Sequence, residues 1–239
     1  MTNHLQQKVI LITGATGALG SVVTREFAQT SARLVLTSTS EDKLRRLASE
    51  TGLPEDRYLI KTADLSDNVA VTELVNATVE RFGAVDVLLN TAGGWRGGDP
   101  VHKTSLEEWN LMLNMNLHSA FLISRAVLPH MLEAGWGRIV HVASKSAVEP
   151  HGKHAGYAVS KAGVVTLTDV IADEVKGTGV TANVILPSTI DTPNNRKYIP
   201  DAHPEKWVPP EQIAALMRFL CSESAASING SHIGIYGDL

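Results

Sequence analysis

A tyrosine and a lysine four positions apart carry the clearest chemical signal in the sequence, in the segment Tyr157-Ala-Val-Ser-Lys161. On a helix the two side chains would share one face, roughly 6 Å apart. A free phenol titrates at about pH 10, but a neighbouring ammonium stabilises the phenolate and lowers its pKa toward neutrality. The same ammonium can also bind a ligand hydroxyl. The pair therefore predicts proton transfer at working pH, with Ser144 just upstream, after the apolar run 138–143.

Apolar runs of strand length alternate with segments of helical spacing along the chain. Strands are expected at residues 9–12, 34–36, 57–61, 85–89, 138–143, 180–186 and 232–236. Helices are expected around residues 19–27, 44–48, 74–82, 104–131, 156–175 and 211–221. Ser38 or Ser40 would cap the second helix, and the capping-box pattern Thr104–Glu107 would open the fourth. This alternation predicts one α/β domain over residues 1–239, a Rossmann-type, doubly wound parallel sheet of about seven strands flanked by helices.

Composition and charge argue against several other classes of protein. The formal net charge is −4 and no basic cluster occurs, which argues against a nucleic-acid surface. No apolar stretch approaches the length of a membrane span, and the polar segment 1–7 lacks the apolar core of a secretory signal. Cys221 is the only cysteine, and the His, Cys and carboxylate residues show no metal-ligand spacing. We therefore expect a cytoplasmic protein with no disulfide, metal, membrane or nucleic-acid partner.

A glycine-rich segment, Thr13-Gly-Ala-Thr-Gly-Ala-Leu-Gly20, lies between the first expected strand and the first helix. Glycines there permit a tight turn and let backbone amides approach a pyrophosphate at the helix N-terminus. Ligands of such sheets bind at the carboxyl ends of the strands, so the segment predicts a dinucleotide site. Asp64, after the third strand, could accept the adenine amino group or be a turn aspartate. The small residues of Asn90–Gly93, after the fourth strand, leave room for a ribose.

With these residues assembled, the chain resembles the classical short-chain dehydrogenase/reductase family over essentially its whole length. The pieces that carry the resemblance are the glycine motif, Asp64, Asn90–Gly93, Asn116, Ser144, Tyr157, Lys161 and the segment Pro187-Ser-Thr-Ile-Asp-Thr192. The resemblance implies an NAD(P)(H)-dependent oxidoreductase that interconverts a carbonyl and an alcohol by hydride transfer. Tyr157 would be the general acid or base. Lys161 would lower its pKa and hold the nicotinamide ribose, and Ser144 would hydrogen-bond the carbonyl. Asn116, with Asn114 as the competing candidate, would hold a water that links Lys161 to solvent.

The resemblance also implies a cofactor site made from the ends of successive strands. Its residues would be Gly14, Thr16, Ala18, Leu19, Gly20, Ser38, Thr39, Asp64, Leu65, Asn90, Ala92, Gly93, Tyr157, Lys161, Pro187, Ile190 and Thr192. An aspartate at position 38 would select NAD, and basic residues at positions 16 or 39 would select NADP, but hydroxyl residues occupy all three positions. Because the hydroxyls near Lys43 could receive a 2′-phosphate, either NADP or NAD is expected, with NADP favoured.

A second resemblance, to dihydropteridine reductase, concerns the substrate. It is carried by Gly17-Ala-Leu-Gly20, by Ala92-Gly-Gly-Trp95 and by the segment 186–197. It implies a flat substrate, quinonoid dihydropterin, stacked on Trp95. Against it, the chain has the Ser144 and Asn116 that we associate with carbonyl chemistry, and a serine where those reductases bear an acid. Carbonyl reduction or alcohol oxidation is therefore the first expectation, with Trp95, Ser144, Tyr157 and His151 as candidate substrate contacts. His151 and the nearby His154 could equally belong to a solvated loop.

Two further segments suggest how the site is covered and how the chain assembles. The Pro-rich stretch 193–210 contains Tyr198 and Trp207 and is expected to cover the substrate, although an ordered surface crossover is the alternative. The helices near residues 111–122 and 164–167 are unusually apolar, which together with the family resemblance favours a homodimer or homotetramer. A dinucleotide-binding module without turnover remains a third hypothesis, although such a protein would be expected to have lost part of the Asn116, Ser144, Tyr157 and Lys161 set.

Overall fold

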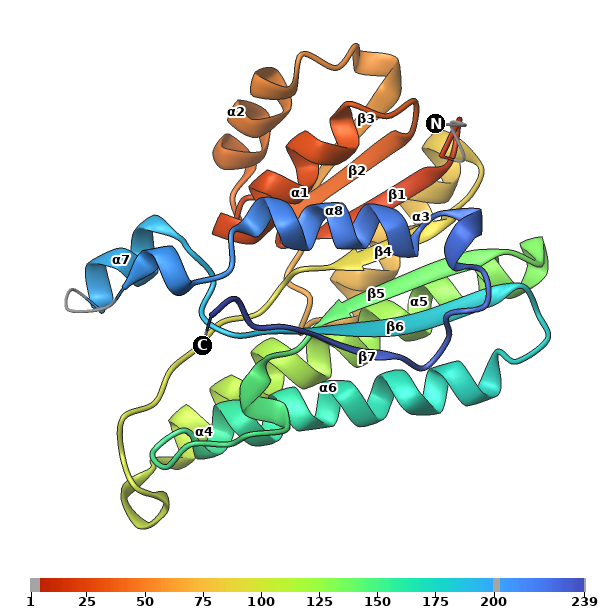
Figure 1. The fold of residues 1–239 in the computed structure, drawn as a ribbon. Helices are drawn as coiled ribbons and strands as arrows, with labels where there is room; N and C mark the ends of the chain where they lie inside the picture. The colour runs from red at the N-terminus through yellow and green to blue at the C-terminus, as the bar shows by residue number, and fades with distance from the viewer. Residues whose placement is uncertain (1–4, 200–202, 239) are drawn as a thin grey trace.

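The fold is built on seven parallel strands, and the computed structural model describes residues 5–199 and 203–238 (Figure 1). The strands are β1 (Val9–Thr13), β2 (Arg33–Ser38), β3 (Tyr58–Thr62), β4 (Val87–Asn90), β5 (Gly137–Val142), β6 (Val180–Pro187) and β7 (His232–Ile235). They form one sheet in the order β3-β2-β1-β4-β5-β6-β7, and every pair is parallel. This arrangement confirms the predicted doubly wound α/β architecture.

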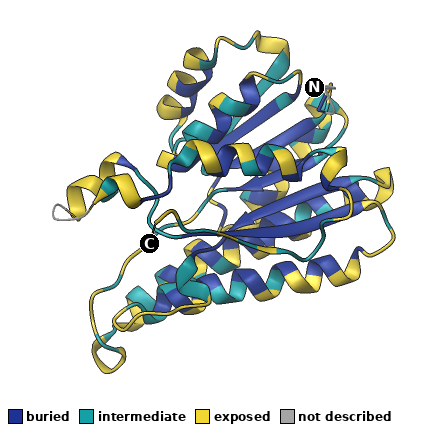
Figure 2. Ribbon diagram, viewed as in Figure 1, coloured by how far each residue is buried: buried dark blue, intermediate teal, exposed yellow. Residues whose placement is uncertain are grey.

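Helices cover both faces of the sheet. They are α1 (Ala18–Ala28), α2 (Glu41–Thr51), α3 (Asn68–Phe82), α4 (Leu106–Met112), α5 (Ser119–Ala134), α6 (Ala155–Glu174), α7 (Pro193–Tyr198) and α8 (Pro210–Leu220). Helices α1, α2 and α8 pack on Ile10 and Ile12 of β1, whereas α3, α5 and α6 pack on the alternate residues Val9 and Leu11. The central strands are accordingly buried on both faces, as the apolar runs predict (Figure 2).

The order of the strands reverses between β1 and β4, which are hydrogen-bonded neighbours. From β1 the chain continues to β2 and β3 on one side, and from β4 it continues to β5, β6 and β7 on the other. The loops after β1 and β4 therefore lead to opposite faces of the sheet, and such a point is where α/β sheets form a ligand-binding crevice. Thr13 and Asn90, the last residues of the two strands, stand opposite each other in the register. The predicted glycine-rich segment and Asn90–Gly93 therefore meet at one point of the sheet edge.

The predicted long helix 104–131 is one continuous helix, Leu106–Ala134, with a π-helical segment at Leu113–His118. Its N-cap is Ser105, whose Oγ accepts from the Glu108 amide at 3.0 Å, one position later than the predicted capping box. By length and composition this helix could cross a membrane, which corrects the expectation that no apolar stretch has that length. It lies on the sheet and buries Ile123 and Val127 there.

Other boundaries differ from the expectation for local reasons. Strand β4 begins at Val87 rather than residue 85, because the Asp86 carboxylate binds the Val9 amide and the Lys8 ammonium, both at 2.8 Å. Ser40, not Ser38, is the N-cap of α2, and within the described chain its side chain makes no capping hydrogen bond.

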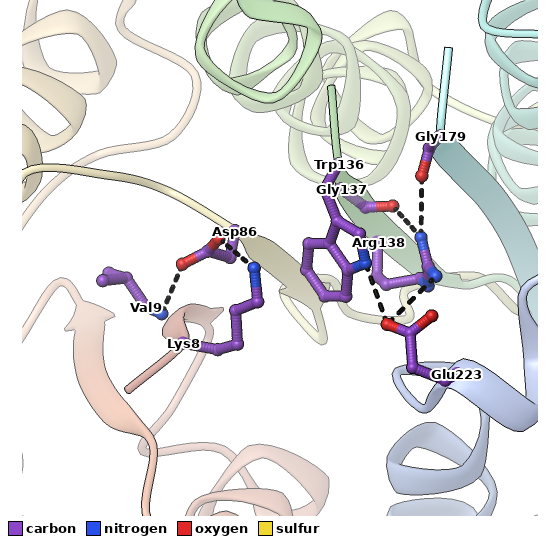
Figure 3. A network of polar contacts seen from close by, with 8 residues as sticks. All are labelled: Lys8, Val9, Asp86, Trp136, Gly137, Arg138, Gly179 and Glu223. Atoms are coloured by element: carbon purple, nitrogen blue, oxygen red, sulfur yellow. Dashed lines mark hydrogen bonds and ion pairs between the residues drawn. The ribbon is translucent and has the colours of Figure 1, made fainter. Parts of the chain in front are cut away.

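A polar clamp fastens the amino ends of the strands, opposite the crevice (Figure 3). The Trp136 ring lies between the Lys8 ammonium, 3.8 Å from the ring centre, and the Arg138 guanidinium carbon at 4.4 Å. Arg138 is buried and donates to the carbonyls of Gly137 and Gly179 at 2.8 and 2.9 Å. Glu223 accepts from the Trp136 indole at 3.0 Å and lies 3.9 Å from Arg138. The clamp joins β5 to the loop before β6 and to the segment after α8.

The stretch 193–210 leaves and rejoins the body at one place. An isolated parallel bridge pairs Ile190 with Val208, and the Asp191 amide donates to the Val208 carbonyl at 2.8 Å. Helix α7 projects from the body beyond this bridge (Figures 1 and 2). Trp207 is 5% exposed and packs into the base, whereas Tyr198 is 76% exposed. Trp207 therefore belongs to the base of the stretch and Tyr198 to its projecting part, and residues 200–202 lie outside the described part.

Candidate active site

The glycine-rich turn after β1 has no room for side chains at two of its glycines. Gly14 has a φ of +60°, and a Cβ there would lie 2.8 Å from the Cα of Ala92. A Cβ at Gly20 would lie 2.2 Å from the Gly14 carbonyl oxygen and 2.8 Å from Thr91 Oγ1. The turn is thus pressed against the loop after β4, which brings the two predicted cofactor segments into contact. A Cβ at Gly17 would meet only the Gly14 carbonyl oxygen, at 3.1 Å, so this position is less crowded.

The first turn of α1 suits a pyrophosphate. Helix α1 begins at Ala18 with no acidic residue in its first turn, and within the described chain no side chain caps it. The first amides of a helix have no partner inside the helix and carry the positive end of its dipole. Gly17 and Ala18 are exposed, Thr16 is half-buried and Leu19 is buried in the core. The cradle therefore fits the diphosphate of a dinucleotide, which the backbone amides of residues 18–20 and Thr16 would hold.

Asn90 belongs to a buried chain of polar side chains. Thr13 Oγ1 donates to Asn90 Oδ1 at 2.6 Å, and Asn90 Nδ2 lies 3.0 Å from His141 Nδ1. His141 Nε2 in turn lies 3.2 Å from Ser124 Oγ on α5. Burial lowers the pKa of His141 to about 4, with the charge of Lys161 as the lesser cause. The hydrogen bonds of the Asn90 side chain therefore link β1, β4, β5 and, through His141, α5. Only the Asn90 backbone is left to contact a cofactor.

The ends of β2 and β3 offer hydroxyls and one exposed carboxylate to the adenosine half of a cofactor. Ser38 Oγ accepts from the Ser40 amide at 3.3 Å, while Thr39 is exposed. Asp64 is exposed and accepts from both the amide and the hydroxyl of Ser66, at 2.9 and 2.6 Å. These bonds lower its pKa. Asp64 thus takes the turn role that was its alternative, with a second carboxylate oxygen still available. Leu65 is buried behind it.

Asn116 lies in the π-helical segment and is bound on every side. Its Nδ2 donates to the Gly94 carbonyl at 3.1 Å and to Ser160 Oγ at 3.0 Å, while its Oδ1 accepts from the Gly94 amide at 3.0 Å. The widened turn directs this amide at the loop after β4, and π-bulges are common at functional sites. The competing candidate, Asn114, lines a groove on the outer surface instead. The structure therefore favours Asn116 over Asn114, and the Asn116 amide fixes the loop after β4.

Lys161 is buried beside this loop. Its Nζ donates to the Val142 carbonyl at 2.9 Å, and burial lowers its pKa to about 8. Gly93 has a φ of +150°, and a Cβ there would lie 2.7 Å from Asn116 Oδ1 and 3.1 Å from Lys161 Nζ. The sequence-predicted residues of β4, α6 and the π-helical segment are thus brought together, with a glycine required between them.

Tyr157 lies one helical turn before Lys161 on α6 and hydrogen-bonds Ser144. Burial raises the pKa of the Tyr157 phenol, and the bond to Ser144 opposes that rise. The Lys161 ammonium does not lower the pKa of Tyr157 as expected, because it donates to the Val142 carbonyl. Loss of hydration makes the phenolate less stable in this buried site. Ser144 is buried and caps a short 3-10 turn by accepting from the Ser146 amide at 3.2 Å. Proton donation to one substrate oxygen would require such a pairing of a phenol and a hydroxyl.

Residues on two other loops line the same side of the fold. Trp95 is 57% exposed, and its ring contacts His154 edge-on, with centroids 5.4 Å apart. His151 lies 6.5 Å from His154. Pro187 ends β6, Ile190 is half-buried at the base of the stretch 193–210, and Thr192 caps α7.

Several supporting groups escape prediction from the sequence. Met112 Sδ accepts from the Arg96 amide at 3.2 Å, and nothing in the sequence indicates that Ser160 and Gly94 bond the Asn116 side chain. Among residues 5–199 and 203–238, no group of three or more His, Cys, Asp or Glu side chains is placed to hold a metal.

The sequence is similar to those of known proteins over nearly its whole length. The model of the short chain dehydrogenase family matches residues 8–203. The D-threitol dehydrogenase of Mycolicibacterium smegmatis is 34% identical over 98% of this chain and 93% of its own. The 3-oxoacyl-[acyl-carrier-protein] reductase of Thermotoga maritima is 33% identical over 99% of both chains.

Solved structures show the same fold. A variant of actinorhodin polyketide ketoreductase, crystallised with NADPH, superposes with a TM-score of 0.88 at 29% identity, over 97% of this chain and 96% of that one. Levodione reductase gives a TM-score of 0.89 at 31% identity, over 98% and 97% of the two chains. The chain therefore belongs to the short-chain dehydrogenase/reductase family, whose members are NAD(P)-dependent oxidoreductases that interconvert carbonyls and alcohols.

Proposed function

We propose that Tyr157 and Ser144 perform the proton chemistry of a ketone reductase or secondary-alcohol dehydrogenase. The observation that carries the proposal is the bonded pair of phenol and hydroxyl beside the buried ammonium of Lys161. When bound, the dinucleotide supplies or accepts the hydride. In reduction Ser144 donates a hydrogen bond to the carbonyl oxygen and Tyr157 gives that oxygen its proton; in oxidation Tyr157 takes the proton back.

We propose that Lys161 stabilises the Tyr157 phenolate and that Asn116 holds the loop after β4 in place. The buried Lys161 ammonium lies one helical turn after Tyr157 and 3.1 Å from the position of a Cβ at Gly93, so it would stabilise a phenolate as it forms during turnover. Asn116 fixes that loop through both atoms of its amide. Nothing in the comparisons supports the pterin alternative, and the complete set of four residues argues against a binding module without turnover.

For the cofactor we propose NADP rather than NAD. The end of β2 carries Ser38 and Thr39 and no carboxylate, so a 2′-phosphate meets no charge at the strand end. Among the described residues, the Ser40 hydroxyl makes no capping bond and is available to such a phosphate. Glu41 and Asp42 in the first turn of α2 oppose this preference, although Glu41 is paired with Arg45. We therefore expect a modest discrimination, with NAD still accepted.

We propose a homodimer or homotetramer formed through the long helix. Its outer side and α6 line an apolar groove of about 420 Å³, made by Leu113, Asn114, Leu117, His118, Phe121 and Leu167. Phe121 is 44% exposed, which is unusual for a large apolar side chain beside such a groove. Light scattering on the purified protein would measure the assembly. We further propose a single domain in the cytoplasm, without membrane or nucleic-acid partners.

We also propose that the stretch 193–210 closes over bound substrate. Its base is fixed by the Ile190–Val208 bridge, while the exposed Tyr198 on α7 is free to approach the crevice. Protection of residues 193–199 from proteolysis by cofactor and substrate together, but not by either alone, would support closure.

A ketone panel tests the proposed activity directly. Consumption of NADPH and then NADH would be followed with simple ketones, quinones and quinonoid dihydropterin. Turnover of ordinary ketones, faster with NADPH, is the expected result. Turnover of the dihydropterin alone would reverse the choice of substrate, and silence with every compound would favour the module without turnover.

A further inference from the structure

A buried histidine, His141 on β5, takes no part in the proton chemistry proposed above. Its ring lies between Asn90 at the end of β4 and Ser124 on α5, with one ring nitrogen against each, and all three side chains are buried. Polar atoms buried in this way are paired as donor and acceptor, so the groups around the ring decide which nitrogen carries the hydrogen.

The direction of these hydrogen bonds is fixed on α5. Ser124 Oγ lies 2.7 Å from the Ala120 carbonyl oxygen, one turn earlier in the same helix. A carbonyl oxygen can only accept, so the single hydroxyl hydrogen of Ser124 lies in this bond. The Ser124 oxygen is left as an acceptor toward His141 Nε2, 3.2 Å away. The imidazole must therefore carry its hydrogen on Nε2.

The tautomer of His141 in turn fixes the orientation of the Asn90 amide. Burial lowers the pKa of His141 to about 4, so the imidazole is neutral at pH 7 and its Nδ1 carries only a lone pair. The atom that faces Nδ1 at 3.0 Å is therefore the Asn90 amide nitrogen, and Asn90 Oδ1 is turned to Thr13. The Thr13 hydroxyl, 2.6 Å from this oxygen, must donate to it.

The chain of hydrogen bonds ends on the loop that follows β4. Because its hydrogen is given to Asn90, the Thr13 hydroxyl oxygen can accept from the Ala92 amide, 3.3 Å away. The Thr13 carbonyl accepts from the Thr91 hydroxyl at 2.6 Å. Thr13 thus holds two consecutive loop residues where a Cβ at Gly14 would lie 2.8 Å from the Ala92 Cα. Every donor in the chain points from this loop toward α5.

The opposite tautomer would break the chain at both ends. With the hydrogen on Nδ1 of His141, the Asn90 amide would turn its nitrogen to Thr13. The Thr13 hydroxyl would then face N–H donors from both Asn90 and Ala92, and its own hydrogen would lose its acceptor. At the other end, the bare Nε2 would face a Ser124 oxygen whose hydrogen is already given away.

We propose that His141 is a positioning residue for the cofactor: its Nε2–H tautomer, acting through Asn90 and Thr13, holds the loop 91–93 against the glycine-rich turn in the arrangement that binds NADP(H). This rests on the proposed cofactor role of that loop. Loss of the chain should weaken cofactor binding, whereas the rate at saturating cofactor depends on the phenol and hydroxyl of the proposed mechanism, which lie outside it.

The tautomer can be measured without turnover. In protein labelled with ¹⁵N-histidine at pH 7, the ring nitrogens of His141 are assigned by their absence in His141→Asn. They are expected to show a hydrogen on Nε2 and a bare Nδ1. A hydrogen on Nδ1 would overturn the inference, whatever the activity of the protein.

Two substitutions separate the two nitrogens of the ring. His141→Asn places an amide oxygen near the position of Nδ1 and keeps an acceptor for Asn90, whereas His141→Gln places its amide nitrogen near the position of Nε2 and removes that acceptor. The Kd for NADPH should stay near wild type in His141→Asn and rise about tenfold in His141→Gln. With a ketone, kcat of His141→Gln at saturating NADPH should stay within about twofold of wild type. Equal Kd values in the two variants would overturn the inference.

Thr13→Val removes the loop end of the chain at nearly constant shape. Its matched control is Thr78→Val, because Thr78 is equally buried but donates to the Leu74 carbonyl within α3. Thr13→Val should raise the Kd for NADPH about tenfold, and Thr78→Val should not change it.

The double variant of Thr13→Val and His141→Gln should bind NADPH no more weakly than either single variant, because both cut the same chain. Additive losses would mean that the two residues act separately, which would overturn the inference. Failure of the wild type to bind NADPH or NADH would count against the proposed function instead, and the tautomer of His141 would still test the hydrogen-bond chain.

Discussion

Replacement of Gly93 by alanine is the substitution that probes the packing of the site most sharply. A Cβ there would lie 2.7 Å from Asn116 Oδ1 and 3.1 Å from Lys161 Nζ, and the φ of +150° is strained for any side chain. Strain of this kind costs about 1–3 kcal/mol and overpacking about another 1–3 kcal/mol. We therefore expect Gly93→Ala to lower the free energy of unfolding by about 2–6 kcal/mol.

The matched control is Gly52→Ala at the C-terminus of α2. Gly52 also has a positive φ, +65°, but no described atom lies within 4 Å of the position of its Cβ. Only left-handed strain remains there, about 1–2 kcal/mol. Urea unfolding of both variants should thus separate strain from the clash at Gly93.

Activity gives the second readout for Gly93→Ala. Relief of the clash requires movement of Asn116 or the Lys161 ammonium, and a displacement of about 1 Å in a catalytic group costs about a hundredfold in rate. We expect kcat/KM with NADPH and a ketone to fall by that order, while Gly52→Ala stays near wild type. If Gly93→Ala matched Gly52→Ala in stability and kept its rate, the contact of this loop with Asn116 and Lys161 would be wrong.

Three further predictions concern stability and cofactor choice. Arg138→Met leaves the Gly137 and Gly179 carbonyls without their buried donor and should lower the free energy of unfolding in urea by about 2–4 kcal/mol. An unchanged free energy of unfolding would mean that the clamp does not stabilise the fold. Because the folded pKa of His141 is about 4 against 6.5 in a free histidine, the unfolded chain takes up the proton first as pH falls from 6.5 to 4. The free energy of unfolding should decline by about 3 kcal/mol between pH 6.5 and pH 4, and His141→Asn should remove this pH dependence. If the free energy of unfolding of His141→Asn depended on pH as that of the wild type does, the prediction would be contradicted. Ser38→Asp places a carboxylate at the end of β2 and should shift the ratio of kcat/KM toward NADH by about tenfold or more, and an unchanged ratio would remove position 38 from the cofactor site.

The strands and the cofactor crevice could be predicted because their signals are local. Apolar runs such as Val9–Ile12 are readable without knowledge of the fold, and alternation of strand and helix fixes a parallel sheet. The segment Gly14–Gly20 indicates its role because a glycine is needed where two backbones touch. Ser144, Tyr157 and Lys161 could be assigned through their spacing and the family resemblance, and the structure brings them together.

The parts that could not be predicted depend on contacts between distant segments. The pKa of Tyr157 is raised because burial of the phenol outweighs its hydrogen bond to Ser144, while the Lys161 ammonium, which the sequence spacing makes prominent, donates to the Val142 carbonyl instead. Asn90 is drawn into a chain of side chains that includes His141, which no pattern in the sequence connects to it. Trp207 is buried at the base of the stretch 193–210 because the Ile190–Val208 bridge folds that base onto the body.

The central claim is that Tyr157 transfers the proton in a site that binds the dinucleotide without it. The most direct measurement compares wild type with Tyr157→Phe for two quantities, the Kd for NADPH from fluorescence titration and the single-turnover rate of NADPH oxidation with a ketone. Since the ring is kept and the lost hydroxyl is the one bonded to Ser144, the Kd for NADPH should stay the same. The rate should fall by about 10²–10⁴-fold, the usual contribution of a positioned general acid. A variant that keeps the wild-type rate would contradict the assignment of Tyr157 as the proton donor.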